Sequence, residues 1–311
     1  MTEIPSSESG ATASKAQPPV PPDNSVIVRA PTATEAARVR HLFRDISLPL
    51  QSQFLVVVKL QPVERFVAGL AGWSEGPFAR FHLASPPGVD ANQYAPRLIE
   101  EASLTARNAG LSQMVYGDLL TDDDRRAALL RLNGFTVLRS ERFFRIDAVL
   151  GENRVLELAQ KFARLIPGNW RTDSIRNHSS ETILELLAPY RLMMPEEIRR
   201  HWRLDAVHGF EPDLSSILFE GEHPFGALLV RRMGDVVSFD VRVVNHRNRV
   251  LRGVANLLLL QHCSQHYDRE RTPVRWLLFR GGEVEHRETA NLAFRMGGEE
   301  VAPRRVFARE L

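Results

Sequence analysis

The stretch from Val241 to Gln261 constrains the fold of this chain more than any other. An apolar, strand-like run at Val236–Val244 leads through a short arginine-rich loop into Arg252-Gly253-Val254-Ala255, where an apolar helix is expected to begin. A strand that enters a helix through a glycine turn presents unpaired backbone N–H groups and the positive end of the helix dipole. Because Gly253 and Ala255 are small, an anion can approach this backbone closely. The segment therefore predicts an α/β fold with an anion site at the start of this helix.

The rest of the chain narrows the class of protein. Its 311 residues are enough for two domains with separate cores. No stretch has the length and apolar character of a membrane span, and the N-terminus lacks the pattern of a signal peptide. A single cysteine, Cys263, excludes an intramolecular disulfide framework. We therefore expect a cytoplasmic protein, with residues 1–24, rich in Ser, Pro and Ala, as a disordered tail.

The charge composition argues against a nucleic-acid partner. The formal net charge is only +2, and acidic and basic residues alternate along the chain. Lysine occurs only at Lys15, Lys59 and Lys161, so almost all cations are arginines, which can grip phosphate and stack on bases. This bias raises RNA as a weak alternative, but codon bias in a G+C-rich genome and solvated helix faces are the simpler explanation.

The predicted elements occur in the same order twice. Each copy begins with a strand and a helix, continues with further strands, and ends with a helix, a strand, a helix and a final strand. The lag between the copies is about 150–160 residues, which indicates a duplicated unit. We predict two α/β domains, at 25–150 and 151–311, each with a mixed central sheet covered by helices on both faces.

Two segments carry a resemblance to a known family. LRGVANLLLL, at 251–260, resembles the acyl-CoA pyrophosphate loop of the GNAT N-acyltransferases, whose common form is Gln/Arg-x-x-Gly-x-Gly/Ala. Gly253 and Ala255 match the two small positions and Arg252 the frequent basic residue, whereas Val250 departs from the pattern, with Arg249 beside it as a substitute. NLAFRMGGEEVAPRRVF at the chain end, and AALLRLNGFTVL in the first half, resemble the family's last helix, glycine turn and strand. The resemblance covers residues 25–311 as a tandem pair.

This resemblance implies acetyl-CoA, or a related acyl-CoA, as co-substrate of the second half and an amine as acceptor. The equivalent first-half loop, at 84–96, lacks the glycine pair and carries Asp90, so the first half is expected to be a degenerate copy. In the second half the cofactor would contact backbone groups of a strand that splays from its neighbour, and then the loop and helix. The implied cofactor residues are Val243, Val244, Arg249, Arg252, Gly253, Val254, Ala255 and Asn256.

The catalytic groups are less well defined by this pattern. Asp240, just before the splayed positions, is the best-placed carboxylate for a general base, directly or through water. The alternative is that Asp240 faces solvent on an alternating strand. The family's frequent tyrosine acid falls at Ala293, or at Leu130 in the first half, so protonation of the thiolate would pass to water or to His286. The pattern favours His286 as a partly exposed helix-cap residue with no catalytic role.

Two further clusters invite a functional role. The segment PYRLMMPEEIRRHW corresponds to the family's acceptor groove, and Tyr190, Met193, Met194 and Trp202 would line an apolar substrate wall or simply pack their helices. His262 and His266 stand four residues apart beside Cys263, but a full metal-binding signature is missing. We expect a solvated helix face there and no metal.

Two functions follow from these observations. The first is an N-acyltransferase that moves an acetyl or other acyl group from acyl-CoA to an amine. The alternative is a catalytically silent tandem GNAT-fold module that binds acyl-CoA or a protein partner, which the missing acid at Ala293 and Leu130 favours.

Overall fold

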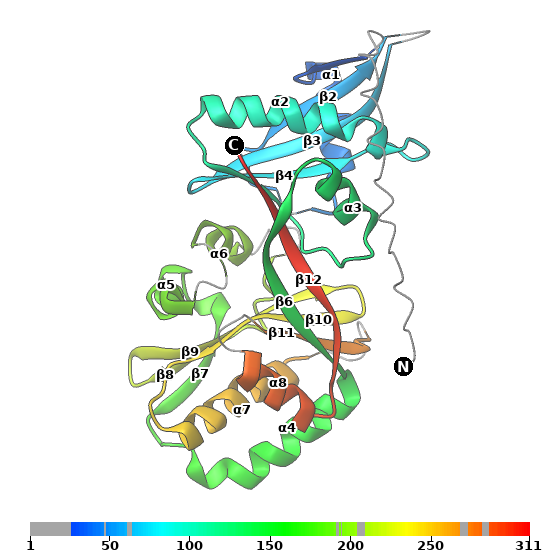
Figure 1. The fold of residues 1–311 in the computed structure, drawn as a ribbon. Coiled ribbons are helices and arrows are strands. Elements are labelled where there is room, and N and C mark those ends of the chain that lie inside the picture. The colour runs from blue at the N-terminus through cyan, green and yellow to red at the C-terminus, as the bar shows by residue number, and fades with distance from the viewer. Residues whose placement is uncertain are drawn as a thin grey trace, which may run out of the picture.

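The computed structural model describes residues 26–46, 48–60, 64–190, 193, 195–203, 209–267, 273–281 and 286–311, with residues 91 and 286–288 described by their backbone alone. The predicted tail at 1–24 lies outside these ranges. The described strands form one mixed twelve-stranded sheet with helices on both faces (Figure 1). The predicted α/β class is therefore confirmed.

The first half supplies six strands and three α-helices. They are β1 (Val26–Arg29), α1 (Ala33–Leu42), β2 (Gln53–Lys59), β3 (Arg65–Glu75), β4 (Phe78–Ala84), α2 (Ala95–Asn108), β5 (Gln113–Tyr116), α3 (Arg125–Leu132) and β6 (Thr136–Asp147). The second half contains α4 (Ala148–Phe162), β7 (Trp170–Ser174), α5 (Glu181–Leu187), α6 (Pro195–Trp202), β8 (Ser216–Glu220), β9 (His223–Met233), β10 (Val236–Val244), α7 (Arg249–Gln265), β11 (Trp276–Gly281), α8 (His286–Arg295) and β12 (Glu299–Glu310).

The same glycine turn follows the last helix of each half. Gly134 after α3 and Gly297 after α8 have φ values of 78° and 79°, in the left-handed region that side chains with a Cβ rarely adopt. Backbone N–H groups beyond each turn bond back into the helix, from Phe135 to the carbonyl of Leu130 and from Gly298 to that of Ala293. The sequence repeat is therefore a structural repeat.

The final strands of the two halves are exchanged. The strand order is β1-β2-β3-β4-β5-β12-β6-β11-β10-β9-β8-β7, so β12 pairs with β5 of the first half, and β6 pairs with β11 of the second. Figure 1 shows β6 and β12 crossing side by side between the halves. The backbone ladder is continuous from one half to the other. The predicted division at residue 150 falls within α4 and remains a prediction.

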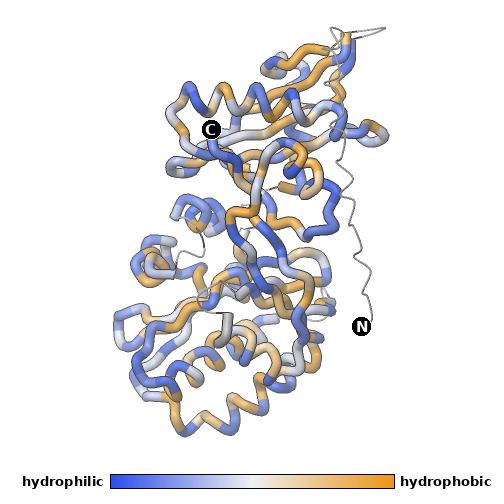
Figure 2. Tube along the Cα trace, in the orientation of Figure 1, coloured by the Kyte–Doolittle hydropathy of each residue, from blue (hydrophilic) through white to orange (hydrophobic). Residues whose placement is uncertain are grey.

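The hydrophobic cores lie on both faces of the sheet. In the second half, α4, α7 and α8 cover one core, which includes Phe239 and Phe279, and α5 and α6 cover another on the opposite face, which includes Val241 and Val243. In the first half, α2 and α3 cover the main core and α1 a smaller one. Hydrophobic residues follow the strands and the helices packed on them (Figure 2). None of the helices in the described part of the chain is long and apolar enough to cross a membrane.

Candidate functional site

An opening in the ladder between β10 and β11 defines the candidate site of the second half. The two strands run parallel from the pair Val236–Trp276 to the pair Phe239–Phe279, and no further pair follows. β10 nevertheless stays paired with β9 as far as Val244, with a bulge at Asp240. One edge of residues 240–244 therefore has no strand beside it among the residues that the structure describes. The predicted backbone positions, Val243 and Val244, lie on this stretch, with their side chains buried in the cores.

Helix α7 starts earlier than the sequence pattern predicted. It begins at Arg249, and the carbonyl of Asn248 accepts the first intrahelical bond from Arg252 N at 2.9 Å. Gly253 therefore lies in the second turn, where a backbone N–H bonds to the carbonyl four residues earlier. The prediction of free N–H groups at Gly253 is wrong because the helix extends one turn further toward its N-terminus. The terminal N–H groups belong to residues 249–251, and the Asn248 side chain accepts those of Val250 and Leu251 at 2.9 and 3.3 Å.

The side chains of the predicted cofactor segment face in different directions. Val254 and Ala255 are buried in the core beneath α7, whereas Arg249 and Gly253 are exposed and Arg252 is half-buried. A Cβ added at Gly253 would meet no heavy atom within 4 Å, so the fold itself does not require glycine there. The cofactor roles of these residues remain predictions.

An arginine that the sequence pattern did not single out ties the elements around the opening together. Arg242, on β10, donates to Oδ1 of Asn256 on α7 and to Oγ1 of Thr289 on α8, the latter at 2.7 Å. Asn256 in turn donates to the carbonyl of Arg252 at 2.9 Å. The predicted cofactor residue Asn256 therefore holds the helix to the splayed strand. An arginine among the valines at 241, 243 and 244 was the available sequence signal.

Asp240 is buried beside the opening, and only 4% of its surface is exposed. The alternative that it faces solvent is therefore wrong. Its Oδ2 forms an ion pair with Arg231 on β9, and its Oδ1 accepts from Oγ of Ser238 at 2.6 Å. Burial alone would raise the pKa of Asp240, but the charge and hydrogen bond of Arg231 outweigh it and hold the pKa below its usual value. Asp240 is thus an ionised carboxylate with a donor on each oxygen.

Buried charges from both halves gather around Asp240, at what we call the charged junction. Three ion pairs form it: Glu75–Arg80 on β3 and β4, Asp240–Arg231 on β9 and β10, and Glu141–Arg280 between β6 and β11. Helix α6, which lies between the two halves in Figure 1, adds Glu197, Arg200 and His201, whose side chains interact electrostatically with these ion pairs. Sequence reasoning missed this junction because its members are scattered from β3 to β11 and meet only after strand exchange.

In the first half, a histidine occupies the matching position. β4 and β5 pair as far as Phe81–Tyr116, so the residue after the last pair is His82, as it is Asp240 in the second half. The His82 ring lies against Gly117, where an added Cβ would approach its Nε2 to 2.3 Å, and stacks on Trp73 at 5.4 Å. Burial lowers the pKa of His82 to about 4, although Asp118, 3.6 Å away, opposes the shift. His82 is therefore a neutral ring that packs over the point where β4 and β5 part.

The predicted substrate residues pack into the core under α5 and α6. Met193 is buried there, and Tyr190 and Trp202 pack against the same cluster. The indole N–H of Trp202 also donates to the carbonyl of His178 at 3.0 Å. These are the contacts of the helix-packing alternative, and the groove role stays a prediction. Met194 and the side chain of His286 lie outside the described residues.

The two helix histidines stack on each other. The ring centroids of His262 and His266 are 4.3 Å apart. Among the described residues, no group of three His, Cys, Asp or Glu side chains is arranged to hold a metal ion. The pair therefore contributes to the polar groove between α7 and β7, which is also lined by Asp173 and Asn177.

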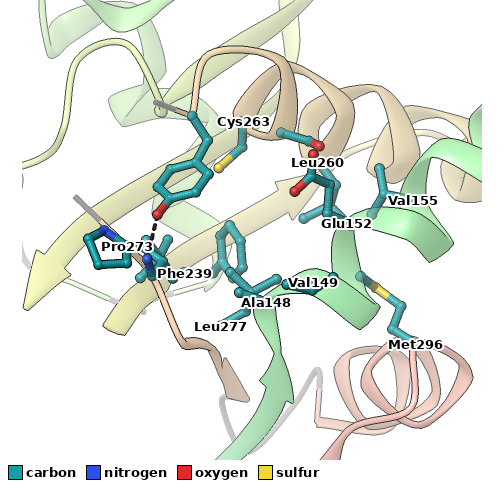
Figure 3. Close-up of a pocket in the computed structure, with 14 residues that line it drawn as sticks. Ala148, Val149, Glu152, Val155, Phe239, Leu260, Cys263, Pro273, Leu277 and Met296 are labelled. Atoms are coloured by element: carbon teal, nitrogen blue, oxygen red, sulfur yellow. Dashed lines mark hydrogen bonds between the residues drawn. The ribbon is translucent and has the colours of Figure 1, made fainter. Parts of the chain in front are cut away.

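A cavity of about 230 Å³ lies in the second-half core, and Figure 3 shows its lining. Its walls come from α4, α7, β10 and β11, and the Tyr267 hydroxyl at one end accepts from Val274 N at 2.5 Å. Burial raises the pKa of the Cys263 thiol in this wall to about 12, so the thiol stays protonated and is no nucleophile. Phe239, which lines the cavity, also contacts Phe279, with ring centroids 4.4 Å apart and the two rings tilted by 39°.

Comparison with known proteins rests on structure alone. No family model and no curated relative matches the chain. Among solved structures, it is similar to a tandem GNAT protein from the clavulanic acid biosynthesis pathway, with a TM-score of 0.59 and 15% identity over 92% of this chain and 98% of that one. A GCN5-related N-acetyltransferase from Sphaerobacter thermophilus follows, with a TM-score of 0.55 and 13% identity over 92% and 96%. A third, from Kribbella flavida, has a TM-score of 0.55 and 12% identity over 92% and 72%. The chain therefore has the tandem GNAT fold, with two GNAT-like halves in one polypeptide.

Proposed function

We propose that this protein is an N-acyltransferase, which transfers an acetyl or related acyl group from acyl-CoA to an amine, and that its second half binds the acyl-CoA. The observation that carries the proposal is the opening between β10 and β11 after Phe239–Phe279, with the bulge at Asp240 and the start of α7 directly beyond it. An acyl thioester fits such an opening because unpaired strand N–H groups can polarise its carbonyl. Structural neighbours named as N-acetyltransferases support the reaction class.

The phosphate end of the co-substrate would lie at the start of α7. The three terminal N–H groups of residues 249–251 and the helix dipole favour an anion there. Arg249 and Arg252 add positive charge close by. A phosphate that uses the N–H groups of Val250 and Leu251 must displace the Asn248 side chain, which now accepts both.

At the other end of the opening, the acceptor amine would attack the thioester carbon, and the carbon–sulfur bond would break. Asp240 supplies negative charge that attracts the acceptor ammonium, and the proton leaves through this carboxylate or through water. Arg231 weakens Asp240 as a base because it stabilises the ionised form. With Ala293 and Leu130 at the positions of the family's acid, the departing thiolate takes its proton from water or from His286.

Calorimetry with acetyl-CoA tests this proposal on three forms of the full chain. Wild type should bind one equivalent, and Gly253→Glu should abolish binding because its carboxylate would repel phosphate. Gly253→Ala is the matched control for folding, since a Cβ meets nothing within 4 Å. Release of free thiol in an amine screen then measures transfer. Absence of binding by wild type at millimolar acetyl-CoA sinks the proposal.

A second candidate is a tandem GNAT module that binds acyl-CoA or a protein partner without turnover. The observation that favours it is Asp240, whose oxygens already have donors in Arg231 and Ser238. Stoichiometric acetyl-CoA binding without thiol release across a broad amine panel would support this candidate. Turnover of any amine at ordinary enzymatic rates would exclude it.

A further inference from the structure

Helix α6 places two charged side chains, Glu197 and Arg200, beside the ion pairs of the charged junction. Arg80, Arg231 and Arg280 each have a carboxylate partner, in Glu75, Asp240 and Glu141. Glu197 and Arg200 lie one helical turn apart on α6, and the Nε atom of Arg200 is buried without a hydrogen-bond partner within the described part of the chain. Both side chains are half-buried. Opposite charges act on both groups, Glu75 and Glu197 on Arg200, and Arg80 and Arg280 on Glu197. A buried donor without a hydrogen bond is nevertheless costly, so Arg200 Nε points to an acceptor that is not part of the chain.

A buried donor from the other half lies beside Arg200. The Arg200 guanidinium sits over the Trp73 ring of β3, 5.6 Å from its centroid. Trp73 is only 7% exposed, and its indole Nε1 has no hydrogen-bond partner among the described residues. A buried N–H of this kind normally has an acceptor. Arg200 and Trp73 thus present two unmatched donors together, one from each half.

Charges of both signs act on the side chains of α6. Burial lowers the pKa of Arg200, and together with Arg80 and Arg231 it outweighs the opposing charges of Glu197 and Glu75, so an anion placed beside Arg200 would stabilise its charged form. Burial would raise the pKa of Glu197, but Arg80 and Arg280 outweigh it and hold the pKa below its usual value, so the side chain is a carboxylate. His201, the next residue on α6, feels the charges of both Arg231 and Asp240. An anion site at Arg200 and Trp73 therefore adjoins the negative charges of Glu197 and Asp240.

We propose that the acceptor is a zwitterion, an amine that also carries a carboxylate or phosphate group, and that α6 recognises both of its charges. Arg200 and the Trp73 N–H bind the anionic group, and Glu197, with Asp240 beyond it, binds the ammonium. The inference rests on the proposed acyl transfer and names its substrate class. It also gives the first half a role, since Trp73 completes the acceptor site of the second half.

Binding of matched ligand pairs to the full chain tests this site without requiring turnover. Saturation-transfer NMR would compare the common amino acids with the amines that lack their carboxylates, and O-phosphoethanolamine with ethanolamine. We expect binding by at least one zwitterion and a loss of roughly ten- to a hundredfold in its affinity when the anionic group is removed. The two arms distinguish a carboxylate from a phosphate as the anionic group.

Three variants assign the contacts. Arg200→Gln should weaken the zwitterion by roughly ten- to a hundredfold and leave its parent amine unchanged. Trp73→Phe, which keeps the ring and removes the N–H, should weaken the zwitterion less. Arg199→Gln is the matched control, because its exposed guanidinium pairs with Glu181 on the outer side of α6. All three variants should bind acetyl-CoA as wild type does.

The outcomes separate this inference from acyl transfer itself. It is overturned if no zwitterion in the panel binds, if parent amines bind as tightly, or if Arg200→Gln has no more effect than Arg199→Gln. Equal rates of thiol release with plain amines and with zwitterions would support the transferase proposal and contradict the zwitterion site. Zwitterion binding that depends on Arg200, without thiol release, would support the zwitterion site and contradict the transferase proposal.

Discussion

Arg280 of β11 donates two hydrogen bonds to the carboxylate of Glu141 on β6, one of them 2.7 Å long, and so joins the two halves by a buried ion pair. Both side chains are less than a tenth exposed. The contact exists because β6, a first-half strand, pairs with β11 of the second half. Arg280 is also the first residue of β11 after its last pair with β10, so the Glu141–Arg280 ion pair lies at the edge of the opening.

Glu141→Gln should destabilise the whole chain. The change leaves at most one of the two hydrogen bonds and removes the largest favourable charge acting on the buried Arg280, which keeps only the weaker attraction of Asp240 and Glu197. Breaking a buried ion pair in this way costs up to about 3–5 kcal/mol. Urea unfolding measures the loss. Glu299→Gln is the matched control, because Glu299 pairs with Arg145 across the β6–β12 ladder at the exposed surface, where such a pair is worth about 0–1 kcal/mol. Equal losses in the two variants would contradict the structural role of Glu141.

Acyl-CoA should bind once per chain, at the start of α7. Arg249→Ala combined with Arg252→Ala should weaken binding, since each charge-assisted phosphate contact is worth about 1.5–3 kcal/mol and its loss about ten- to a hundredfold. Asp90→Ala should change the affinity little, because the Asp90 carboxylate accepts the N–H of Asn92 in its own loop. Calorimetry gives both numbers. A stoichiometry of two, or a larger effect from the Asp90 change, would reverse the assignment of the halves.

Asn248→Ala should lower stability and strengthen acyl-CoA binding together. The loss of a helix N-cap costs about 1 kcal/mol, while the N–H groups of Val250 and Leu251 become available to phosphate without competition. Asp147→Ala removes the equivalent cap of α4, which accepts from Val149 and Leu150, far from the proposed site. It should cost similar stability and leave the affinity unchanged. If Asn248→Ala instead weakens binding, the phosphate does not use these groups.

Stability should fall as the pH drops from about 6.5 toward 4. Burial depresses the pKa of His82 and His201 to about 4 in the folded chain, so between these pH values the unfolded chain binds more protons. Each neutral histidine therefore contributes stability at pH values above its pKa in the unfolded chain. Up to about 3 kcal/mol of this contribution is lost for each histidine as the pH falls through its pKa in the folded chain. The free energy of unfolding, measured at several pH values in this range, should depend less steeply on pH in His82→Gln than in wild type. It should depend on pH as in wild type in His223→Gln, which alters an exposed ring. The same pH dependence of the free energy of unfolding in wild type and in His82→Gln would show that His82 does not titrate as described.

Gly117→Ala should destabilise the first half because the new Cβ would approach Nε2 of His82 to 2.3 Å. Overpacking of this kind costs about 1–3 kcal/mol. Gly168→Ala is the control, since nothing lies within 4 Å of a Cβ there. Thermal unfolding compares the two variants. Gly117→Ala should cost less stability when it is introduced into His82→Ala than when it is introduced into wild type, because the ring that the new Cβ would clash with is gone. An unaffected Gly117→Ala would mean that the ring is not held against the strand.

Local patterns along the chain predicted the elements and their order well. The predicted strand Val236–Val244 is β10, and the predicted glycine turns follow α3 and α8. These agree because glycine turns, caps and apolar periodicity act over a few residues. The start of α7 was placed wrongly because Gly253 was taken to end a loop. Asn248 instead caps the helix one turn earlier, and a glycine within a helix costs only about 1 kcal/mol, which packing of the apolar face outweighs.

The sequence by itself determined the duplicated α/β unit, the glycine turns that close α3 and α8, and the resemblance of residues 251–260 to an acyl-CoA loop. Only the tertiary structure decided that the final strands change places, because strand pairing depends on contacts between residues far apart in the chain. That exchange brings Glu141 to Arg280, and α6 brings Arg200 to Trp73. Whether a charged residue such as Asp240 is buried and paired, or solvated, depends on these distant neighbours, so no local pattern could predict it.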